Sequence, residues 1–320
     1  MDIHDQVAQA HDRIRGRIRE TPLEFSTELS RMVGGSVHLK LENLQHTGSF
    51  KLRGAANKLA CLPATTRSAG VVAASTGNHG AAVAFGARQD GIQAIVFAPE
   101  NASPEKLRNV ESLGAEVRRV GEDCLVAERA ARTFAAEHSM EYISPYNDPD
   151  VVAGQGTVGS ELVAQLEEFD AVIASVGGGG LLGGIGGFLA GSGRTVEVIG
   201  CSPRNSSVMH ASLRAGEILD LPSDPTLSDG TAGGIEPDTI TFPLCQQVID
   251  RFTLVTEAEI RAALRVVVGR HHMMIEGAAA AAVAALLQEP EHFAGRSTVV
   301  VLCGANIDPR TFAEVLLEDG

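Results

Sequence analysis

The sequence lacks any long uninterrupted run of apolar residues, although 44% of its 320 residues are hydrophobic. A helix that spans a membrane needs about 20 consecutive apolar residues, so no membrane partner is expected. Residues 1–20 are charged and helical in pattern, which argues against a secretory signal or a transit sequence. The composition therefore predicts a compact α/β protein that resides in the cytoplasm.

Positive charge is also scarce, since 26 Lys and Arg residues stand against 40 Asp and Glu residues and the net charge is -14. A protein that binds nucleic acid needs clustered Lys and Arg side chains to neutralise phosphates. We therefore expect no nucleic-acid partner, and we attribute the acidity to solubility.

The cysteines lack the paired spacing of a zinc site. Their odd number, in a chain expected in the cytoplasm, indicates reduced thiols. The five cysteines are Cys61, Cys124, Cys201, Cys245 and Cys303.

Short apolar runs alternate with helical periodicity from residue 70 onward, which predicts open, mostly parallel twisted sheets flanked by helices. We expect two α/β domains: a large one of residues 1–62 plus 149–320, and a small one of residues 63–148. Residues 221–243 are rich in turn formers and predict a long functional loop. The expected strands are 36–42, 71–74, 94–98, 116–120, 141–144, 171–176, 196–201 and 298–302. The expected helices are 5–19, 51–62, 78–89, 104–113, 124–138, 206–216, 257–271 and 276–288.

The segment from Thr47 to Asn57 reads TGSFKLRGAAN and contains the candidate covalent residue, Lys51. A Gly-Ser pair just before it suits the start of a helix. Lysine condenses with aldehydes to form a Schiff base, and it becomes nucleophilic when its surroundings lower its pKa. A solvated surface lysine in an amphipathic helix is the alternative interpretation.

Three further motifs stand where strands should end, which is where open α/β sheets bind ligands. They are a loop at Ser75–Gly80, a tetraglycine loop at Gly177–Gly180, and a Cys-Gly-Ala-Asn turn that begins at Cys303. A glycine loop between a strand and a helix directs backbone amides and a helix N-terminus at one point, which favours binding of a phosphate.

Five motifs in this order resemble the pyridoxal phosphate enzymes of the threonine/serine dehydratase and serine racemase family, which have fold type II and are tryptophan synthase beta-like. The resemblance covers nearly the whole chain. The motifs are Ser-Phe-Lys at 49–51, Ser-Xaa-Gly-Asn-His at 75–79, Gly-Gln-Gly-Thr at 154–157, Gly-Gly-Gly-Gly at 177–180 and Gly-Xaa-Asn at 304–306.

This resemblance implies pyridoxal 5'-phosphate as the cofactor, an amino acid as the substrate and a homodimer as the assembly. It also implies that the cofactor lies in the cleft between the two domains and that the small domain, residues 63–148, is on the substrate side. It implies that Lys51 is the catalytic residue, which holds the cofactor and removes the alpha proton of the substrate. The implied cofactor-binding residues are Lys51, Phe50, Asn78, Gly177, Gly178, Gly179, Gly180, Leu181 and Cys303. The implied substrate-binding residues are Ser75, Thr76, Gly77, Asn78, His79 and Gln155.

Several of these positions have a structural alternative. Asn78 could be an ordinary helix cap rather than a partner of the cofactor's ring hydroxyl, and the turn at Gln155 could also be a cap. Cys303 could be a small buried hydrophobe. If it faces the pyridine nitrogen instead, its neutral thiol cannot keep that nitrogen protonated, which favours β-elimination over transamination.

The expected reaction is the dehydration and deamination of a β-hydroxy amino acid, such as L-threonine or L-serine, to a 2-keto acid and ammonia. A dehydratase for a hydroxyectoine-derived or 3-hydroxyaspartate-like amino acid is an alternative, as is a serine racemase. Racemases of the family carry a serine at the position of Thr76, whose methyl group crowds the substrate, so elimination is favoured.

The glycine loop can also be interpreted as a dinucleotide site. Gly178, Gly180 and Gly183 fit a dinucleotide fingerprint with Glu197 as the ribose-binding acid, which would suit a non-catalytic dinucleotide-binding protein. That protein would have no use for the lysine segment, so the pyridoxal phosphate interpretation is preferred.

A metal site is not expected. Family members activated by a divalent cation carry Glu and Asp where this chain has Ser202 and Val208. Neither residue is a useful ligand for such a cation.

Overall fold

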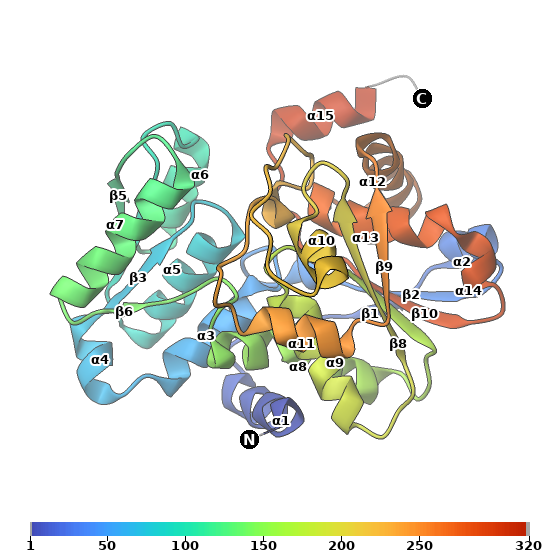
Figure 1. Cartoon of the computed structure of the whole chain (residues 1–320), viewed down its shortest axis with the longest axis horizontal. Coiled ribbons are helices and arrows are strands. Elements are labelled where there is room, and N and C mark those ends of the chain that lie inside the picture. Colours follow the sequence, from blue (N-terminus) through green and yellow to red (C-terminus); the bar gives the residue numbers. More distant parts are fainter. Residues whose placement is uncertain (1, 318–320) are drawn as a thin grey trace.

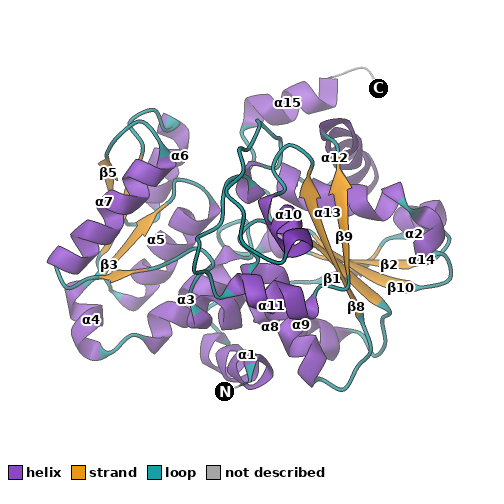
Figure 2. Ribbon diagram, viewed as in Figure 1, coloured by secondary structure: helices purple, strands orange, loops and turns teal. Residues whose placement is uncertain are grey.

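Two separate sheets organise the chain in the computed structural model, which describes residues 2–317. A six-stranded sheet has the order β1-β2-β10-β7-β8-β9, and a four-stranded sheet has the order β5-β4-β3-β6. Figure 1 shows the smaller sheet with its helices on the left and the larger one on the right, and Figure 2 separates strands from helices by colour.

The larger sheet is parallel except at one edge, where β1 runs antiparallel to β2. Its central strands are buried throughout, which is the pattern of a sheet covered on both faces. Its strands are β1 (Leu23–Phe25), β2 (Ser36–Lys40), β7 (Ala171–Ser175), β8 (Glu197–Pro203), β9 (Arg251–Val255) and β10 (Ser297–Val301).

The smaller sheet is parallel throughout and follows the predicted alternation of strand and helix closely. Its strands are β3 (Val71–Ala74), β4 (Ala94–Ala98), β5 (Glu116–Arg119) and β6 (Glu141–Tyr142). The helices among them are α4 (Ala64–Ala69), α5 (Asn78–Asp90), α6 (Pro104–Ser112) and α7 (Cys124–Glu137). The expected α/β class with two mostly parallel sheets is confirmed.

The division into two domains stays a prediction. All four strands of the smaller sheet lie within the predicted small domain, but its apolar core also takes in Leu52, Ala55 and Leu59 from α3 (Lys51–Cys61). Because α3 also carries Lys51, the segment with the candidate covalent residue packs directly against the smaller sheet's helices.

The remaining helices belong to the larger sheet and its surroundings. Among them, α13 (Gly277–Gln288) packs against β7, β8, β9 and β10, and its alanine side chains allow a close approach to the sheet. The remaining helices are α1 (Ile3–Ile14), α2 (Thr27–Val33), α8 (Pro149–Gln165), α9 (Gly180–Gly191), α10 (Val208–Ala215), α11 (Thr241–Val248), α12 (Glu257–His271), α14 (Pro290–Phe293) and α15 (Pro309–Leu317). None of the helices in residues 2–317 has the length and apolar character needed to cross a membrane.

Helix α8 differs most from the sequence-based expectation, which places a turn around Gln155. Glycines 154 and 156 suggest a turn, yet they lie inside a helix. A Cβ atom at Gly154 would lie 2.5 Å from the backbone oxygen of Arg53, and one at Gly184 would lie 2.6 Å from that of Val152. The glycines therefore let α3, α8 and α9 pack backbone against backbone.

Two further expectations are wrong in detail. The first helix ends at Ile14 rather than residue 19, because Gly16 adopts a positive φ of 86° that breaks the helix. The strand expected at 36–42 ends at Lys40, which is fully buried. Its amine donates to Glu161 at 2.5 Å and to the backbone oxygen of Thr21 at 2.7 Å, so an ion pair explains the buried charge.

The long loop at 221–243 is confirmed up to Ile240 and contains one short 3-10 turn, Asp229–Thr231. It ends earlier than predicted, since α11 begins at Thr241, and the sequence patterns predict neither α11 nor β9. In Figures 1 and 2 the loop runs between the two sheets.

Candidate active site

Lys51 is the first residue of α3, and the end of β10 fixes its position. The backbone N–H of Phe50 donates to the backbone oxygen of Cys303 at 3.0 Å, and Ser49 forms an isolated antiparallel bridge with Gly304. A 3-10 turn at Glu42–Leu44 connects β2 to the segment that leads into α3. The chain therefore holds Lys51 beside the carboxyl ends of the parallel strands, where such sheets bind ligands.

Lys51 is half-buried, and its amine donates a hydrogen bond to the backbone oxygen of Pro145 at 2.9 Å. It also lies 5.2 Å from the centre of the Phe50 ring. Burial lowers the pKa of Lys51 to about 8. A lysine with such a pKa is neutral in an appreciable fraction near neutral pH, as a nucleophile or general base must be.

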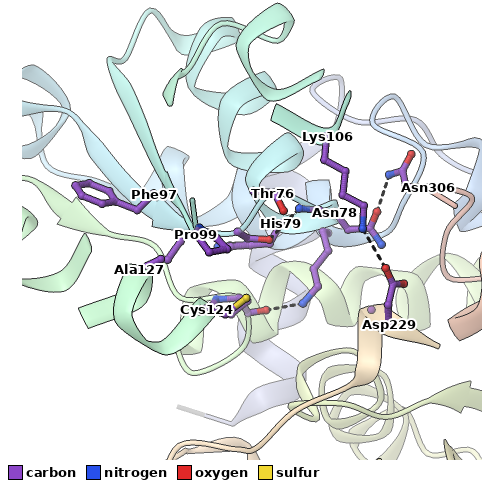
Figure 3. A pocket seen from close by; sticks show the side chains of 16 residues that line it. Thr76, Asn78, His79, Phe97, Pro99, Lys106, Cys124, Ala127, Asp229 and Asn306 are labelled. Atoms are coloured by element: carbon purple, nitrogen blue, oxygen red, sulfur yellow. Dashed lines mark hydrogen bonds and ion pairs between the residues drawn. The ribbon is translucent and has the colours of Figure 1, made fainter. Parts of the chain in front are cut away.

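The loop that joins β3 to α5 lines a cavity of about 330 Å³ together with Lys51. We call this space the Lys51 cavity; Figure 3 looks into it. Ser75, Thr76 and Gly77 precede the first turn of α5, whose free N–H groups attract an anion. His79 donates from Nε2 to the backbone oxygen of Ile143 at 2.8 Å, and burial lowers its pKa to about 3, so its ring is neutral.

Asn78 does not cap its helix, contrary to the structural alternative. Its Nδ2 donates to the carboxylate of Glu276 at 2.9 Å, and its Oδ1 accepts from Asn306 Nδ2 at 2.6 Å. Glu276 is buried and also accepts from the backbone N–H of Asn306 at 3.0 Å. Burial raises the pKa of Glu276 to about 7, so its charge changes near neutral pH.

The glycine loop connects β7 to α9, as predicted. The carbonyl oxygen of Gly178 accepts from Thr241 Oγ1 at 2.6 Å, and that of Gly179 accepts from the thiol of Cys245. In a trans peptide the N–H points away from the carbonyl, so the N–H groups of Gly179 and Gly180 point away from Thr241 and Cys245. Gly179 has a φ of 82°, and Gly180 begins α9, so the loop can cradle a phosphate.

Tyr146 lies over this loop, and no sequence motif marks it. A Cβ atom at Gly178 would lie 2.3 Å from its ring, so only glycine allows the ring to sit there. The hydroxyl of Tyr146 accepts from the backbone N–H of Glu236 at 3.0 Å, which joins the ring to the long loop. The next residue, Asn147, donates to the Glu236 carboxylate at 2.9 Å.

A second, smaller space of about 40 Å³ adjoins the Lys51 cavity and shares Lys51 and Asn78 with it. The remaining predicted cofactor residues line it: Phe50, Gly177, Gly178, Gly179, Gly180, Leu181 and Cys303. Cys303 is buried two residues beyond β10, and its sulfur lies 3.5 Å from Ser175 Oγ. Burial raises the pKa of the Cys303 thiol, so the thiol is neutral.

The dinucleotide interpretation is wrong, because Glu197 lies at the opposite end of the sheet from the glycine loop. The loop follows the last residue of β7, whereas Glu197 pairs with Ala171, the first residue of that strand. Glu197 instead forms ion pairs with Arg296 at 2.6 Å and His292 at 2.9 Å. A ribose held near the glycine loop is out of its reach.

Gln155 is the one predicted site residue that lines neither space. It is buried in α8, where its Oε1 accepts from the backbone N–H of Gly54 at 3.2 Å. Its role toward a substrate stays a prediction, since the observed contact is with the helix that carries Lys51.

Several residues of the site have no signal nearby in the sequence. Glu276 immediately precedes the alanine-rich α13, and Tyr146 lies in a stretch that is typical of an ordinary turn. The only signal for Asn306 is its place in the final Gly-Xaa-Asn motif. Lys106 and Asp229, an ion pair at 3.1 Å, also line the Lys51 cavity, and no pattern identifies them.

Comparison with known proteins supports the resemblance. Residues 14–304 match the sequence profile of a family described as pyridoxal-phosphate dependent enzyme. The chain is 37% identical over 310 residues to the L-threonine ammonia-lyase of Geobacter sulfurreducens, which covers 97% of this chain and 77% of that protein. It is 33% identical over 316 residues to the serine racemase of Dictyostelium discoideum, covering 97% and 96%.

A solved structure agrees with these sequence comparisons. The processed form of threonine deaminase isoform 2 from Solanum lycopersicum superimposes with a TM-score of 0.91 and 32% identity, covering 97% of this chain and 92% of that one. The fold is therefore shared over nearly the whole length of the protein.

Proposed function

The chain belongs to the pyridoxal-phosphate dependent enzyme family, and we propose that it dehydrates and deaminates a β-hydroxy amino acid, L-threonine or L-serine, to a 2-keto acid and ammonia. The observation that carries this proposal is the half-buried Lys51, which lines the spaces beside both anion-suited loops and has its pKa lowered to about 8. The similarity to an L-threonine ammonia-lyase supports the choice of reaction.

The residues present fit the cofactor. The loop at Gly177–Gly180 admits no Cβ atom at Gly178 or Gly179 without contact closer than 3.0 Å, so its neighbours require glycine there, and it leads into the N-terminus of α9, which suits a phosphate. We propose that this loop and Leu181 hold the phosphate, and that Phe50, Asn78 and the neutral thiol of Cys303 lie around the ring.

Pyridoxal phosphate, when bound to an amino acid, withdraws electrons from its Cα and makes the alpha proton acidic. In our proposal the Ser75–His79 loop binds the substrate carboxylate through its amides and the positive end of the α5 dipole. Lys51 then removes the alpha proton, since its amine is neutral in part and lies beside the cavity. The β-hydroxyl leaves as water, and hydrolysis of the dehydrated product releases the keto acid and ammonia.

Elimination is favoured over racemisation in this proposal because inversion needs a second acid on the opposite face of the substrate. Thr76 is the residue at the corresponding place in the loop. Its hydroxyl could donate a proton, but its methyl group occupies space beside the substrate. We therefore expect pyruvate from L-serine to exceed D-serine.

The test is the visible absorption spectrum of the purified protein, before and after L-threonine or L-serine, alongside Lys51→Ala. We expect a band from the lysine-bound cofactor, which shifts with substrate and is absent from the variant. Keto acid and chiral amino acid analysis then rank the products. A colourless protein that stays colourless with added pyridoxal phosphate would refute the cofactor assignment, and D-serine in excess over pyruvate would make the enzyme a racemase.

We also propose that the protein acts as a homodimer in the cytoplasm, by analogy with the family. In this proposal the two sheets belong to two domains, residues 63–148 and the remainder, with the cofactor between them. Light scattering of the purified protein tests the dimer, and a monomer at working concentration would contradict it. Fractionation of the cells tests the location.

A further inference from the structure

An ion pair lines one side of the Lys51 cavity and plays no part in the chemistry described above. Lys106 Nζ lies 3.1 Å from Asp229 Oδ2. Lys106 comes from α6, which belongs to the smaller sheet, while Asp229 begins the 3-10 turn in the long loop. Figure 3 shows the pair reaching toward each other beside Asn78 and Asn306. The pair therefore links two parts of the protein far apart in sequence.

Both partners line the cavity itself. In Figure 3 they lie on the side away from Phe97 and Ala127, which supply an apolar wall. Lys106 also lines a neighbouring groove with Ser103 and Met274, so its side chain stands between that groove and the Lys51 cavity. Any side chain that enters the cavity from that direction meets the pair.

Apart from Lys106 and Asp229, no described residue that lines the cavity offers a charge to balance a charged group on the substrate side chain. Lys51 has the covalent role in the proposed function, and the ring of His79 is neutral. The α7 part of the wall consists of Cys124 and Ala127, which offer no cation to a second carboxylate. While the ion pair is intact, the positive charge of Lys106 and the negative charge of Asp229 cancel, so the cavity presents no unpaired charge to the substrate side chain.

We propose that Lys106 and Asp229 form a charge filter that restricts the enzyme to β-hydroxy amino acids with an uncharged side chain. This inference rests on the proposed function and narrows its substrate class. A second carboxylate on the substrate would have to replace Asp229 as the partner of Lys106, and a second ammonium would have to replace Lys106 as the partner of Asp229. In either case one residue of the pair loses its counter-charge, whereas the side chain of threonine or serine leaves the pair intact.

The pair is suited to this role because both side chains are partly exposed, at 40% and 59%. Ion pairs at that exposure are weak, so the filter operates through selectivity and leaves the stability of the fold almost unchanged. Removing one partner exposes the charge of the other to the cavity. The selectivity should then change in opposite directions for the two single variants.

The experiment measures the binding of three amino acids of similar length that carry no β-hydroxyl and cannot be dehydrated: L-asparagine, L-aspartate and L-2,4-diaminobutyrate. Their dissociation constants come from the spectral change of the holoenzyme and, independently, from competition with L-threonine. In the wild-type enzyme we expect L-asparagine to bind more tightly than either charged analogue. Asp229→Asn should strengthen the binding of L-aspartate relative to that of L-asparagine roughly fivefold. Lys106→Met should strengthen the binding of L-2,4-diaminobutyrate relative to that of L-asparagine by roughly the same factor.

The exchanged pair, Lys106→Asp with Asp229→Lys, should restore the wild-type order. Matched controls are Glu28→Gln and Arg31→Met, which remove the same charges from an ion pair on α2 that does not line the cavity. They should leave all three ratios unchanged. Ratios that stay constant in the Lys106 and Asp229 variants, or that shift in the same direction in both, would overturn the filter.

Production of 2-oxobutyrate from L-threonine is measured in the same preparations. If it is absent while the binding ratios shift as expected, the proposed reaction fails and the filter stands. If turnover is present and the ratios do not shift, the filter alone is wrong.

Discussion

The backbone N–H of Phe50 donates to the backbone oxygen of Cys303 across 3.0 Å, although 253 positions separate the two residues in the chain. This one bond attaches the segment of the candidate covalent lysine to the strand that ends beneath it. Side chains take no part in it, so it survives most substitutions at either position. The position of Lys51 therefore depends on how β10 and α3 are held.

Stability should depend on pH through Glu276. Its pKa is raised to about 7 from 4.5, so between these values the folded protein binds a proton that the unfolded chain does not. The contribution of Glu276 to the free energy of unfolding should therefore fall by about 3 kcal/mol as pH rises through this window, whereas the neutral His79 contributes in the opposite direction. Urea denaturation of the cofactor-free protein at several pH values measures it. Glu276→Gln cannot titrate but keeps His79, so the free energy of unfolding of the wild type relative to this variant should fall by about 3 kcal/mol across the window. A difference between the two proteins that stays constant with pH would contradict the assignment.

Arg53→Met should destabilise the protein strongly. The guanidinium is fully buried and pairs with Glu42 at 2.8 Å and Glu161 at 2.6 Å, while Lys40 also pairs with Glu161. Removing Arg53 leaves buried carboxylates with one cation, at a cost of about 3 to 5 kcal/mol. Urea denaturation provides the measurement.

The matched control for Arg53 is Arg31→Met, since Arg31 pairs with Glu28 on the surface. This variant should unfold at nearly the wild-type urea concentration. Equal midpoints for the two variants would show that the buried network contributes no more than a surface pair.

Gly179→Ala should weaken the cofactor's phosphate binding roughly tenfold. Gly179 has a φ of 82°, and a new Cβ would lie 2.6 Å from the sulfur of Cys245, so the loop must shift. Titration with pyridoxal phosphate and with pyridoxal, which lacks the phosphate, separates the effects: only the first should weaken. The strain of alanine at positive φ is about 1 to 2 kcal/mol.

Gly193→Ala is the control for that loop variant. Gly193 has a comparable φ of 74°, with open space around it and no part in the site. Its cofactor affinity should equal that of the wild type. Weakened binding in both variants would point to loss of stability rather than to the phosphate cradle.

Alkylation of Cys124 should block the enzyme. This thiol is exposed and lines the Lys51 cavity, whereas Cys201, Cys245 and Cys303 are buried. A bulky maleimide on Cys124 should fill the cavity and abolish turnover, with protection by substrate. Mass spectrometry identifies the modified residue. Cys124→Ser should resist inactivation, and rapid inactivation of that variant would mean that another cysteine, such as the half-buried Cys61, is responsible.

Magnesium should not raise the activity of chelator-treated enzyme. Ser202 is buried, its hydroxyl donates to the backbone oxygen of Val176 at 2.7 Å, and it supplies no carboxylate oxygen to a divalent cation. Val208 has no ligand atom in its side chain. A rise in keto acid production on adding magnesium would contradict this expectation.

The elements that the sequence predicts correctly have local causes. Val71–Ala74 and Ala94–Ala98 are short apolar runs between turn formers, and Gly91 closes its helix at a φ of 66°. Both ligand loops are predicted for the same reason, since glycine at the end of a strand marks a turn whatever surrounds it.

The features that the sequence does not predict depend on contacts between distant segments. Glycines 154 and 156 of α8 serve its contact with neighbouring helices rather than a turn, and this contact exists only in the folded protein. The carboxylate of Glu276 joins the site through Asn78, 198 positions away. The pairing of Lys106 with Asp229 likewise has no local signature. Each needs the relative placement of several elements, which periodicity does not provide.

The glycine contacts among α3, α8 and α9 also determine what can vary during evolution. Lys51 begins α3 and the glycine loop opens α9, while α8 touches both through backbone atoms. The spacing between the lysine and the loop is thus set by main chain, which side-chain substitutions cannot adjust. Other residues that line the cavity, Lys106 on α6 with Cys124 and Ala127 on α7, lie on helices outside this stack. New substrates can therefore be accommodated there while the distance from lysine to glycine loop stays constant.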